Sequence, residues 1–160
     1  MSRCFAQRRR ISVLGLVLGL VVLARADVTV QEAAGVKFLP ASEVKAAFAK
    51  GGPILEEAAY KVHAGRRDAP GEAEVHERDT DIFYVVAGTA TIVTGGSVVD
   101  GKTTEPGEIR GPRIDGGDLR PLTKDDMLVV PSGTPHQFTE VTAPFLYYVV
   151  KVTAPEETGQ

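Results

Sequence analysis

Cysteine is almost missing from this 160-residue sequence: the single one, Cys4, lies in a leader that we expect to be removed. The remaining chain can then form no disulfide bond, although its expected setting is an oxidising one. It also offers no cysteine nucleophile, and no serine stands in a strand–turn–helix elbow. These absences argue against covalent catalysis by a thiol or a hydroxyl group, and they leave packing, with a bound metal, as the sources of stability.

Long hydrophobic runs are equally scarce, and the one present, Ile11–Leu23, has 13 residues. It follows the basic run Arg8–Arg10 and precedes a small-x-small site ending at Ala26, which is the pattern of a secretory signal peptide over residues 1–26, cleaved after Ala26. An uncleaved anchor is the alternative, but a bilayer span needs about 20 apolar residues. The arginines partly resemble a twin-arginine export signal. We therefore expect a secreted or periplasmic protein.

Positive charge is in deficit once the leader is gone. The whole sequence has 18 basic and 21 acidic residues, and five of the basic residues lie within residues 1–26. Their removal leaves 13 against 21, a net charge of −8 on 134 residues, which is the length of one domain. Because a chain this acidic is repelled by nucleic acid and by anionic membrane surfaces, we expect no nucleic-acid partner and no membrane partner after cleavage.

Glycine and proline divide the rest of the chain. Residues 27–53 are typical of an arm followed by a short helix over Ser42–Lys50, with Ser42 as its N-cap and Gly51 as its stop. Beyond them the helical period disappears, and five strand-like runs predict an all-β barrel over residues 54–153: Ile54–Ala64, Glu72–Glu77, Ile82–Val93, Met127–Val130 and Phe145–Val152. Within the barrel, residues 97–117 indicate an inserted hairpin or flap. Residues 154–160 are expected to form a flexible tail.

Four polar side chains stand out along these strands. Glu74 and His76 are two residues apart in an alternating run, so both point to one face of a strand. Asp81 follows on the next apolar strand, and His136 ends a turn that begins at Pro131. Two imidazoles and two carboxylates from separate strands predict a metal site or an acid–base site. The alternative is an ordinary strand histidine among solvated acids, and the constrained turn before His136 argues against it.

These residues resemble the two sequence motifs of the cupin superfamily, whose members are small barrels of the double-stranded β-helix type. The first motif has His-x-His, four residues, an acid, six residues and Gly, and its positions here are Glu74, His76, Asp81 and Gly88. The second contains Pro-x-Gly-x-x-His, which is met by Pro131, Gly133 and His136; Asp125 replaces its leading Gly and Glu140 its trailing Asn. The resemblance implies a cupin fold, an antiparallel β-barrel or jelly roll with a short N-terminal helix.

The resemblance also implies a divalent metal, which cupins hold with three His and one Glu. By position, His76 and His136 keep their imidazole roles and Asp81 stands for the Glu. Glu74 stands where the first His belongs, either as a ligand or as a general base. Such a set suits iron, manganese, zinc or nickel. The alternative is that the two replacements leave the site without a metal.

Aromatic side chains share these strands, and four of them are candidates for the lining of a pocket: Phe83, Tyr84, Phe138 and Tyr147. The plainer interpretation of each is barrel core. We place His63 at the surface or at the mouth of the barrel. Residues 96–103 satisfy the phosphate-loop pattern Gly-x4-Gly-Lys-Thr, but Pro106 and Gly107 follow too closely for the helix that this motif requires. We therefore expect no nucleotide.

These patterns favour a metal-dependent enzyme that takes a small organic molecule as its ligand or substrate. Oxygenase, isomerase and lyase chemistry all remain open, because a fold hosts many reactions. One alternative is a non-catalytic module that binds a small ligand, and another is a metal-free barrel that makes protein contacts. The resemblance further implies a homodimer.

Overall fold

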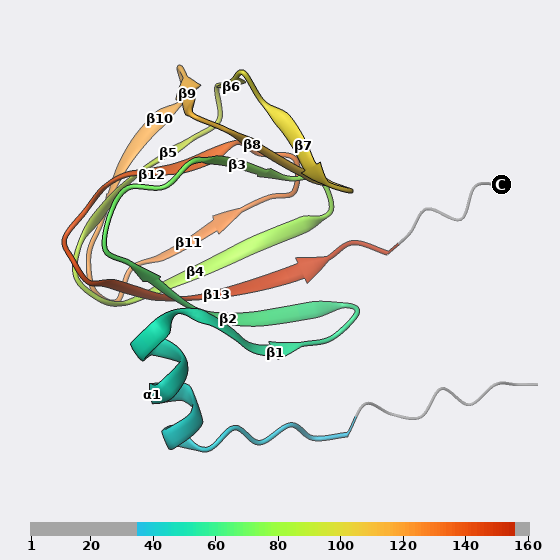
Figure 1. Cartoon of the computed structure of the whole chain (residues 1–160), viewed down its shortest axis with the longest axis vertical. Coiled ribbons are helices and arrows are strands. Elements are labelled where there is room, and N and C mark those ends of the chain that lie inside the picture. Colours follow the sequence, from blue (N-terminus) through green and yellow to red (C-terminus); the bar gives the residue numbers. More distant parts are fainter. Residues whose placement is uncertain (1–34, 156–160) are drawn as a thin grey trace, which may run out of the picture. The chain divides into compact units, whose positions relative to one another are not determined.

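The computed structural model describes residues 35–155 of the chain (Figure 1). The predicted leader over residues 1–26 lies outside the described residues, as do residues 156–160 of the predicted tail. The chain divides into two units, residues 1–36 and 37–160, and the description below concerns the second. Among the described residues, no helix has the length and apolar character needed to cross a membrane.

One helix, α1 (Ala41–Lys50), precedes the strands. Its N-cap is Pro40, whose carbonyl oxygen accepts a bond from the backbone N–H of Val44 at 3.2 Å. The predicted N-cap, Ser42, is wrong, because Ser42 is already the second helical residue and no side chain caps the helix. Gly51 ends the helix, with φ +75°, a conformation that glycine adopts at little cost.

Thirteen strands follow in the described part of the chain. They are β1 (Gly52–Glu56), β2 (Tyr60–Arg67), β3 (Ala73–His76), β4 (Asp79–Ala87), β5 (Ala90–Thr94), β6 (Ser97–Val99), β7 (Lys102–Glu105), β8 (Glu108–Gly111), β9 (Arg113–Asp115), β10 (Asp118–Leu122), β11 (Met127–Val130), β12 (His136–Val141) and β13 (Phe145–Thr153).

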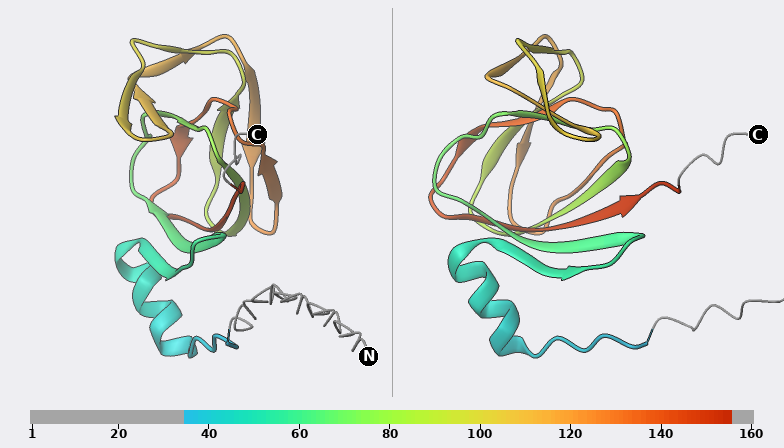
Figure 2. Two further views of the ribbon diagram at one scale, coloured as in Figure 1. Left: turned by 90° about the vertical axis from the view of Figure 1, so that its right-hand side faces the viewer. Right: turned by 45° about the vertical axis from the view of Figure 1, so that its right-hand side comes forward.

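These strands form two large sheets and one short strand pair. The five-stranded sheet has the order β1-β2-β13-β4-β11, the six-stranded sheet has the order β10-β5-β12-β3-β8-β7, and β6 pairs with β9. From β3 to β5, and again from β10 to β13, consecutive strands alternate between the two sheets, so the chain winds around a common interior (Figure 2). All pairings are antiparallel. This winding is a double-stranded β-helix, and the predicted all-β fold class is confirmed.

The strand boundaries differ from the predicted runs where turns and edges intervene. The run Ile54–Ala64 is divided between β1 and β2, and Ile82–Val93 is divided between β4 and β5 at Gly88. Strand β10 was missed because it lies at a sheet edge, is mostly exposed and contains a proline, so it carries no alternating pattern. Residues 97–117 supply β6 to β9, and β8 pairs with β3, so this segment extends the six-stranded sheet.

The interior between the two sheets is apolar at one end. Its buried cluster takes side chains from both sheets: Phe83, Val85, Ala90, Ile92, Leu122, Val130, Phe138, Phe145, Tyr147 and Val149. Burying a side chain of this kind contributes about 1.5–3 kcal/mol relative to leaving it exposed. The cluster therefore holds the two sheets in a fixed relation, which also fixes the polar residues that the same strands carry.

Three motif positions have backbone conformations that explain their residue types. Gly88 has φ +81°, and a Cβ there would lie 2.8 Å from the carbonyl oxygen of Pro144, so only glycine fits. Gly133 has φ +74°. Asp125, which replaces the leading glycine of the second motif, has φ +72° and donates its N–H to the Val85 carbonyl oxygen at 3.0 Å. Because aspartate enters the left-handed region more readily than most residues, the turn survives without its glycine.

Candidate metal centre

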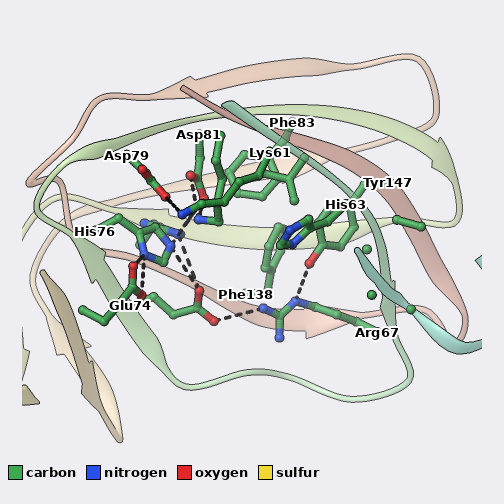
Figure 3. Close-up of a pocket in the computed structure, with 18 of the residues that line it drawn as sticks. Lys61, His63, Arg67, Glu74, His76, Asp79, Asp81, Phe83, Phe138 and Tyr147 are labelled. Carbon is green, nitrogen blue, oxygen red and sulfur yellow. Dashed lines mark hydrogen bonds and ion pairs between the residues drawn. The ribbon is translucent and has the colours of Figure 1, made fainter. Parts of the chain in front are cut away.

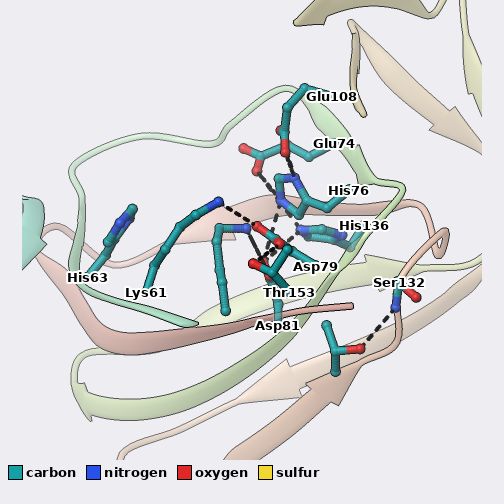
Figure 4. Close-up of polar contacts among 12 residues, drawn as sticks. Lys61, His63, Glu74, His76, Asp79, Asp81, Glu108, Ser132, His136 and Thr153 are labelled. Atoms are coloured by element: carbon teal, nitrogen blue, oxygen red, sulfur yellow. Dashed lines mark hydrogen bonds and ion pairs between the residues drawn. The ribbon is translucent and has the colours of Figure 1, made fainter. Parts of the chain in front are cut away.

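Polar side chains from both sheets meet at the other end of the interior (Figure 4). Glu74 and His76 lie on β3, and His136 opens β12, where it pairs directly with Glu74. Asp81 lies on β4 of the facing sheet. His76, His136 and Asp81 are 4%, 3% and 2% exposed, respectively. The structure therefore brings together all four residues that the motif spacing predicts.

Three of these residues have the spacing of metal ligands. One donor atom from each of Glu74, His76 and His136 lies within 4.8 Å of the other two. The Glu74 Oε2 atom is 3.5 Å from His76 Nε2 and 3.9 Å from His136 Nε2. Metal–ligand bonds of about 2.1 Å place neighbouring donor atoms roughly 3–3.5 Å apart. A small inward adjustment of His136 would thus complete a three-ligand site.

The outer nitrogen of each imidazole is already bonded. His76 Nδ1 lies 2.7 Å from both carboxylate oxygens of Glu108, and His136 Nδ1 lies 3.2 Å from the Thr134 carbonyl oxygen. A carboxylate or carbonyl oxygen only accepts, so each Nδ1 donates a proton to its neighbour. Each neutral imidazole then presents the lone pair of Nε2 to the shared space, which is the arrangement found behind metal-binding histidines.

Whether a metal fits this centre can be judged from the surroundings of His76 Nε2, the ring nitrogen that faces Glu74. Within the described residues, His76 Nε2 is a buried side-chain nitrogen with no hydrogen-bond partner. Its lone pair faces the Glu74 carboxylate at 3.5 Å, so two acceptors confront each other in a buried place. That arrangement is costly unless a proton or a metal ion stands between them. The donor set and its geometry therefore fit a divalent ion.

Glu74 is held in its ionised form. Its Oε1 atom lies 3.3 Å from Arg67 Nη2 (Figure 3). The same atom lies 2.6 Å from Arg110 Nη1, which leaves Oε2 to face the histidines. Burial alone raises the pKa of Glu74, but the contacts with His76, His136 and the two arginines outweigh it and lower the pKa to about 2. A carboxylate with so low a pKa is a weak proton acceptor, so the geometry favours Glu74 as a ligand over Glu74 as a general base.

The pKa values of the two histidines are shifted in opposite directions. Burial lowers the pKa of His76, but the neighbouring carboxylates, Glu74 first among them, outweigh burial and leave the pKa above the usual 6.5. At His136 burial prevails, and the pKa lies below the usual value. His136 is therefore neutral at pH 7, while a proton on His76 competes with a metal for Nε2.

Asp81 lies close to the centre but has a partner of its own. Lys151 Nζ donates to both of its carboxylate oxygens, at 2.8 and 2.9 Å. Its Oδ2 atom is also 3.5 Å from His76 Nε2 and 3.7 Å from His136 Nε2. Asp81 is thus near enough to join the ligand set through Oδ2, which keeps a second lone pair beside the one that accepts from Lys151.

A cavity of about 930 Å³ adjoins the centre, and Phe83, Phe138 and Tyr147 line it. The prediction that Tyr84 lines this pocket is wrong. Tyr84 is 38% exposed, and its hydroxyl group donates to the Asp125 carboxylate at 2.9 Å. The reason is the strand period: Phe83 faces the interior, so its neighbour on β4 must face outward.

His63, which we placed at the surface or the mouth, lines the cavity and lies 3.0 Å from Glu56. Sequence reasoning missed three residues of the centre: Glu108, Arg110 and Lys151. Strand β8 pairs Glu108 with His76 and Arg110 with Glu74, and β13 pairs Lys151 with Asp81. Glu108 lies 32 positions from His76 along the chain, and Lys151 lies 70 positions from Asp81. Their only sequence signal is a place in a strand-like run, because their partners are set by strand pairing.

Comparison with known proteins gives matches in structure alone. No protein-family model matches the sequence, and no curated protein matches it. Among solved structures, protein BH2720 of Bacillus halodurans superposes with a TM-score of 0.52 at 12% identity, covering 77% of this chain and 86% of that one.

Two further solved structures are similar over a smaller part of this chain. A conserved protein of Klebsiella pneumoniae with a double-stranded β-helix domain has a TM-score of 0.48 at 17% identity, covering 68% of this chain and 78% of that one. The cupin domain of Schizosaccharomyces pombe Cnp3 has 0.47 at 11%, covering 64% and 59%. The strand order and winding described above are those of a double-stranded β-helix, which is the fold that the cupin motifs predict. Identities this low concern the architecture only, so the chemistry of this barrel has to be argued from its own residues.

Proposed function

We propose that this protein is a metal-dependent cupin in which Glu74, His76 and His136 hold a divalent ion and the adjoining cavity binds a small organic molecule. The observation that carries the proposal is the pair of Nε2 atoms turned toward the Glu74 carboxylate, with His76 fixed from behind by Glu108. Iron, manganese, zinc and nickel all accept two imidazoles and one carboxylate.

Each side chain of the centre has a definable task in such a protein. A divalent ion bound here supplies Lewis-acid polarisation to an oxygen atom of the ligand. Glu108 keeps the proton of His76 on Nδ1, so that Nε2 stays available. The two arginines on Glu74 Oε1 direct its other oxygen inward. Phe83 and Phe138 give the cavity an apolar wall that limits the water around a bound molecule.

Metal titration tests this proposal directly. Protein purified without chelator should carry close to one equivalent of iron, manganese, zinc or nickel by elemental analysis. The Glu74→Gln variant should bind zinc at least about tenfold more weakly, because a neutral amide replaces a charged ligand. The matched control is Glu77→Gln, an exposed neighbour with the same loss of charge. Wild-type protein with less than about a tenth of an equivalent, and no rise in Tm on adding metal, would exclude the metal proposal.

A non-catalytic ligand-binding cupin is the second candidate, since the same cavity serves binding as well as turnover. The two are separated by mixing metal-loaded protein with a ligand that it binds: unchanged ligand after prolonged incubation indicates a binding module, and a new product indicates an enzyme.

Export and self-association also belong to this proposal. Cleavage after Ala26 predicts a secreted or periplasmic protein that begins at Asp27, and the mass of the protein recovered from culture medium or periplasm tests it. A homodimer is supported by exposed apolar side chains on two neighbouring strands of the five-stranded sheet, Met127 and Val129 on β11 and Tyr84 on β4. Sedimentation of wild type and Met127→Glu tests it, because the charge should shift a dimer toward monomer.

A further inference from the structure

Two lysines face the cavity from neighbouring strands. Strand β13 pairs with β2 so that Lys151 stands directly opposite Lys61, and both side chains line the cavity. Like charges directly opposite each other on paired strands repel, and this arrangement is usually destabilising. A lysine pair of this kind inside a barrel indicates that negatively charged groups lie beside it and offset the repulsion.

Part of that negative charge is built into the barrel wall. Lys151 Nζ bonds to both oxygens of Asp81, at 2.8 and 2.9 Å, and Lys61 Nζ bonds to Asp79 Oδ2 at 3.0 Å. Asp79 is further fixed by the Thr153 hydroxyl group, which donates to Oδ1 at 2.7 Å. An ammonium group has three N–H donors, so each lysine retains a donor for a molecule in the cavity. The side chains are 14% and 36% exposed, which leaves both within reach of such a molecule.

Charge balance shows what the cavity requires when a metal is present. Around the centre, ion pairs join four cationic side chains with four acidic ones: Lys61, Arg67, Arg110 and Lys151 with Glu74, Asp79, Asp81 and Glu108. With neutral histidines this network has no net charge. A divalent ion then adds two positive charges in a place where two of the four carboxylates, Asp79 and Asp81, are buried. Uncompensated charge in such surroundings is costly, so the bound molecule should be an anion.

We propose that Lys61 and Lys151 form a carboxylate-binding subsite beside the metal centre, and that the ligand of this cupin is a small organic anion. This inference rests on the proposed metal function. Lys151 lies close to the centre, because both Lys151 Nζ and His76 Nε2 approach the same atom, Asp81 Oδ2, at 2.9 and 3.5 Å. A molecule of a few heavy atoms can therefore place one oxygen at the metal and a carboxylate against the lysines.

Malonate and malonamide form a probe pair of nearly equal size that differs in charge. Zinc-loaded wild-type protein, freed of excess zinc, is titrated with each compound by calorimetry. Malonate should bind, and malonamide should bind at least about tenfold more weakly, because the amide offers no negative charge to the ammonium groups. Equal affinity for the two compounds would overturn the anionic class of ligand.

Two variants separate the lysines from the metal as the source of affinity. Lys61→Met leaves Asp79 its bond from Thr153, and Lys151→Met combined with Asp81→Asn removes a buried pair together, which avoids a buried unpaired charge. Each should bind malonate about tenfold or more weakly, and Lys61→Met, which leaves Asp81 in place beside the centre, should retain the zinc affinity of the wild type. The control Lys124→Met changes the net charge equally at an exposed position away from the cavity, and it should bind malonate as wild type does.

Three outcomes are informative in different ways. Malonate affinity within about twofold of wild type in zinc-loaded Lys61→Met overturns the lysine subsite and leaves the metal centre standing. Failure of wild-type protein to bind zinc overturns the metal centre and, with it, this inference. If the double variant loses zinc or does not fold, Lys61→Met decides the question alone, because Lys61 is the more exposed of the two lysines.

Discussion

Glu108 offers the sharpest test of the metal centre, because it acts on the centre without being a ligand. Its two oxygens lie 2.7 Å from His76 Nδ1, and its side chain is 25% exposed, so the carboxylate orients the imidazole and increases the basicity of Nε2. Removing a partner of this kind lowers metal affinity by about 10- to 100-fold, or about 1.4–2.7 kcal/mol.

Two substitutions at Glu108 resolve this effect into its parts. Glu108→Gln keeps one carbonyl oxygen that accepts from Nδ1 but removes the charge, so we expect about a tenfold loss of zinc affinity. Glu108→Ala removes the acceptor as well, and we expect the loss to approach about 100-fold. Competition with a chromophoric zinc chelator, at fixed pH and ionic strength, measures both values.

The matched control is Glu105→Gln. Glu105 also lines the cavity and pairs with Glu108 across β7 and β8, but it is exposed and does not contact His76. Zinc affinity should therefore change by less than about twofold. If the Glu108 variants bind zinc as tightly as Glu105→Gln does, the assignment of His76 Nε2 as a metal ligand is refuted.

Three further predictions concern His76, Glu74 and Gly65. Zinc affinity should fall as the pH is lowered through the raised pKa of His76 and should level off above it, which titration across a pH series measures. Glu74 has a folded-state pKa of about 2 against an ordinary 4.5, so it contributes about 3 kcal/mol of stability above pH 4.5 that is lost as the pH falls toward 2. Urea unfolding at several pH values should show this loss in the wild type and a smaller one in Glu74→Gln. Gly65→Ala should destabilise the fold by about 1–3 kcal/mol, because its Cβ would collide with the Tyr147 ring; equal unfolding midpoints would contradict this.

Most of the fold prediction rests on the spacing of the motif residues, and this spacing predicts the barrel for physical reasons. Gly88 and Gly133 occupy turns with positive φ, where side chains are excluded or disfavoured, so their spacing marks the ends of strands. Glu74 and His76 share a face because the strand period is two, which holds whatever surrounds the strand. The same two-residue period places Tyr84 on the outer face of β4, opposite to Phe83. The prediction of Tyr84 as a pocket residue was therefore inconsistent with the strand pattern itself.

Edge strands and helix starts were less predictable. Strand β10 is exposed along most of its length, so no hydrophobic alternation marks it. The helix α1 starts after Pro40, whose carbonyl oxygen accepts from the N–H groups of Glu43 and Val44, so Ser42 lies inside the helix and not at its N-cap. In both cases the sequence signal is weak because the surroundings of the backbone, rather than the side chain, decide the structure.

The sequence by itself determined the barrel, the two histidines and the two acids that approach each other, because these follow from turn conformations and strand period. Only the tertiary structure decided what each acid does. Strand pairing sets Arg110 against Glu74 and Lys151 against Asp81, and these contacts turn one carboxylate toward the histidines and hold the other at the cavity wall. Such pairings join residues far apart in the chain, and an ion pair is specified by the position of both partners, which local sequence does not contain.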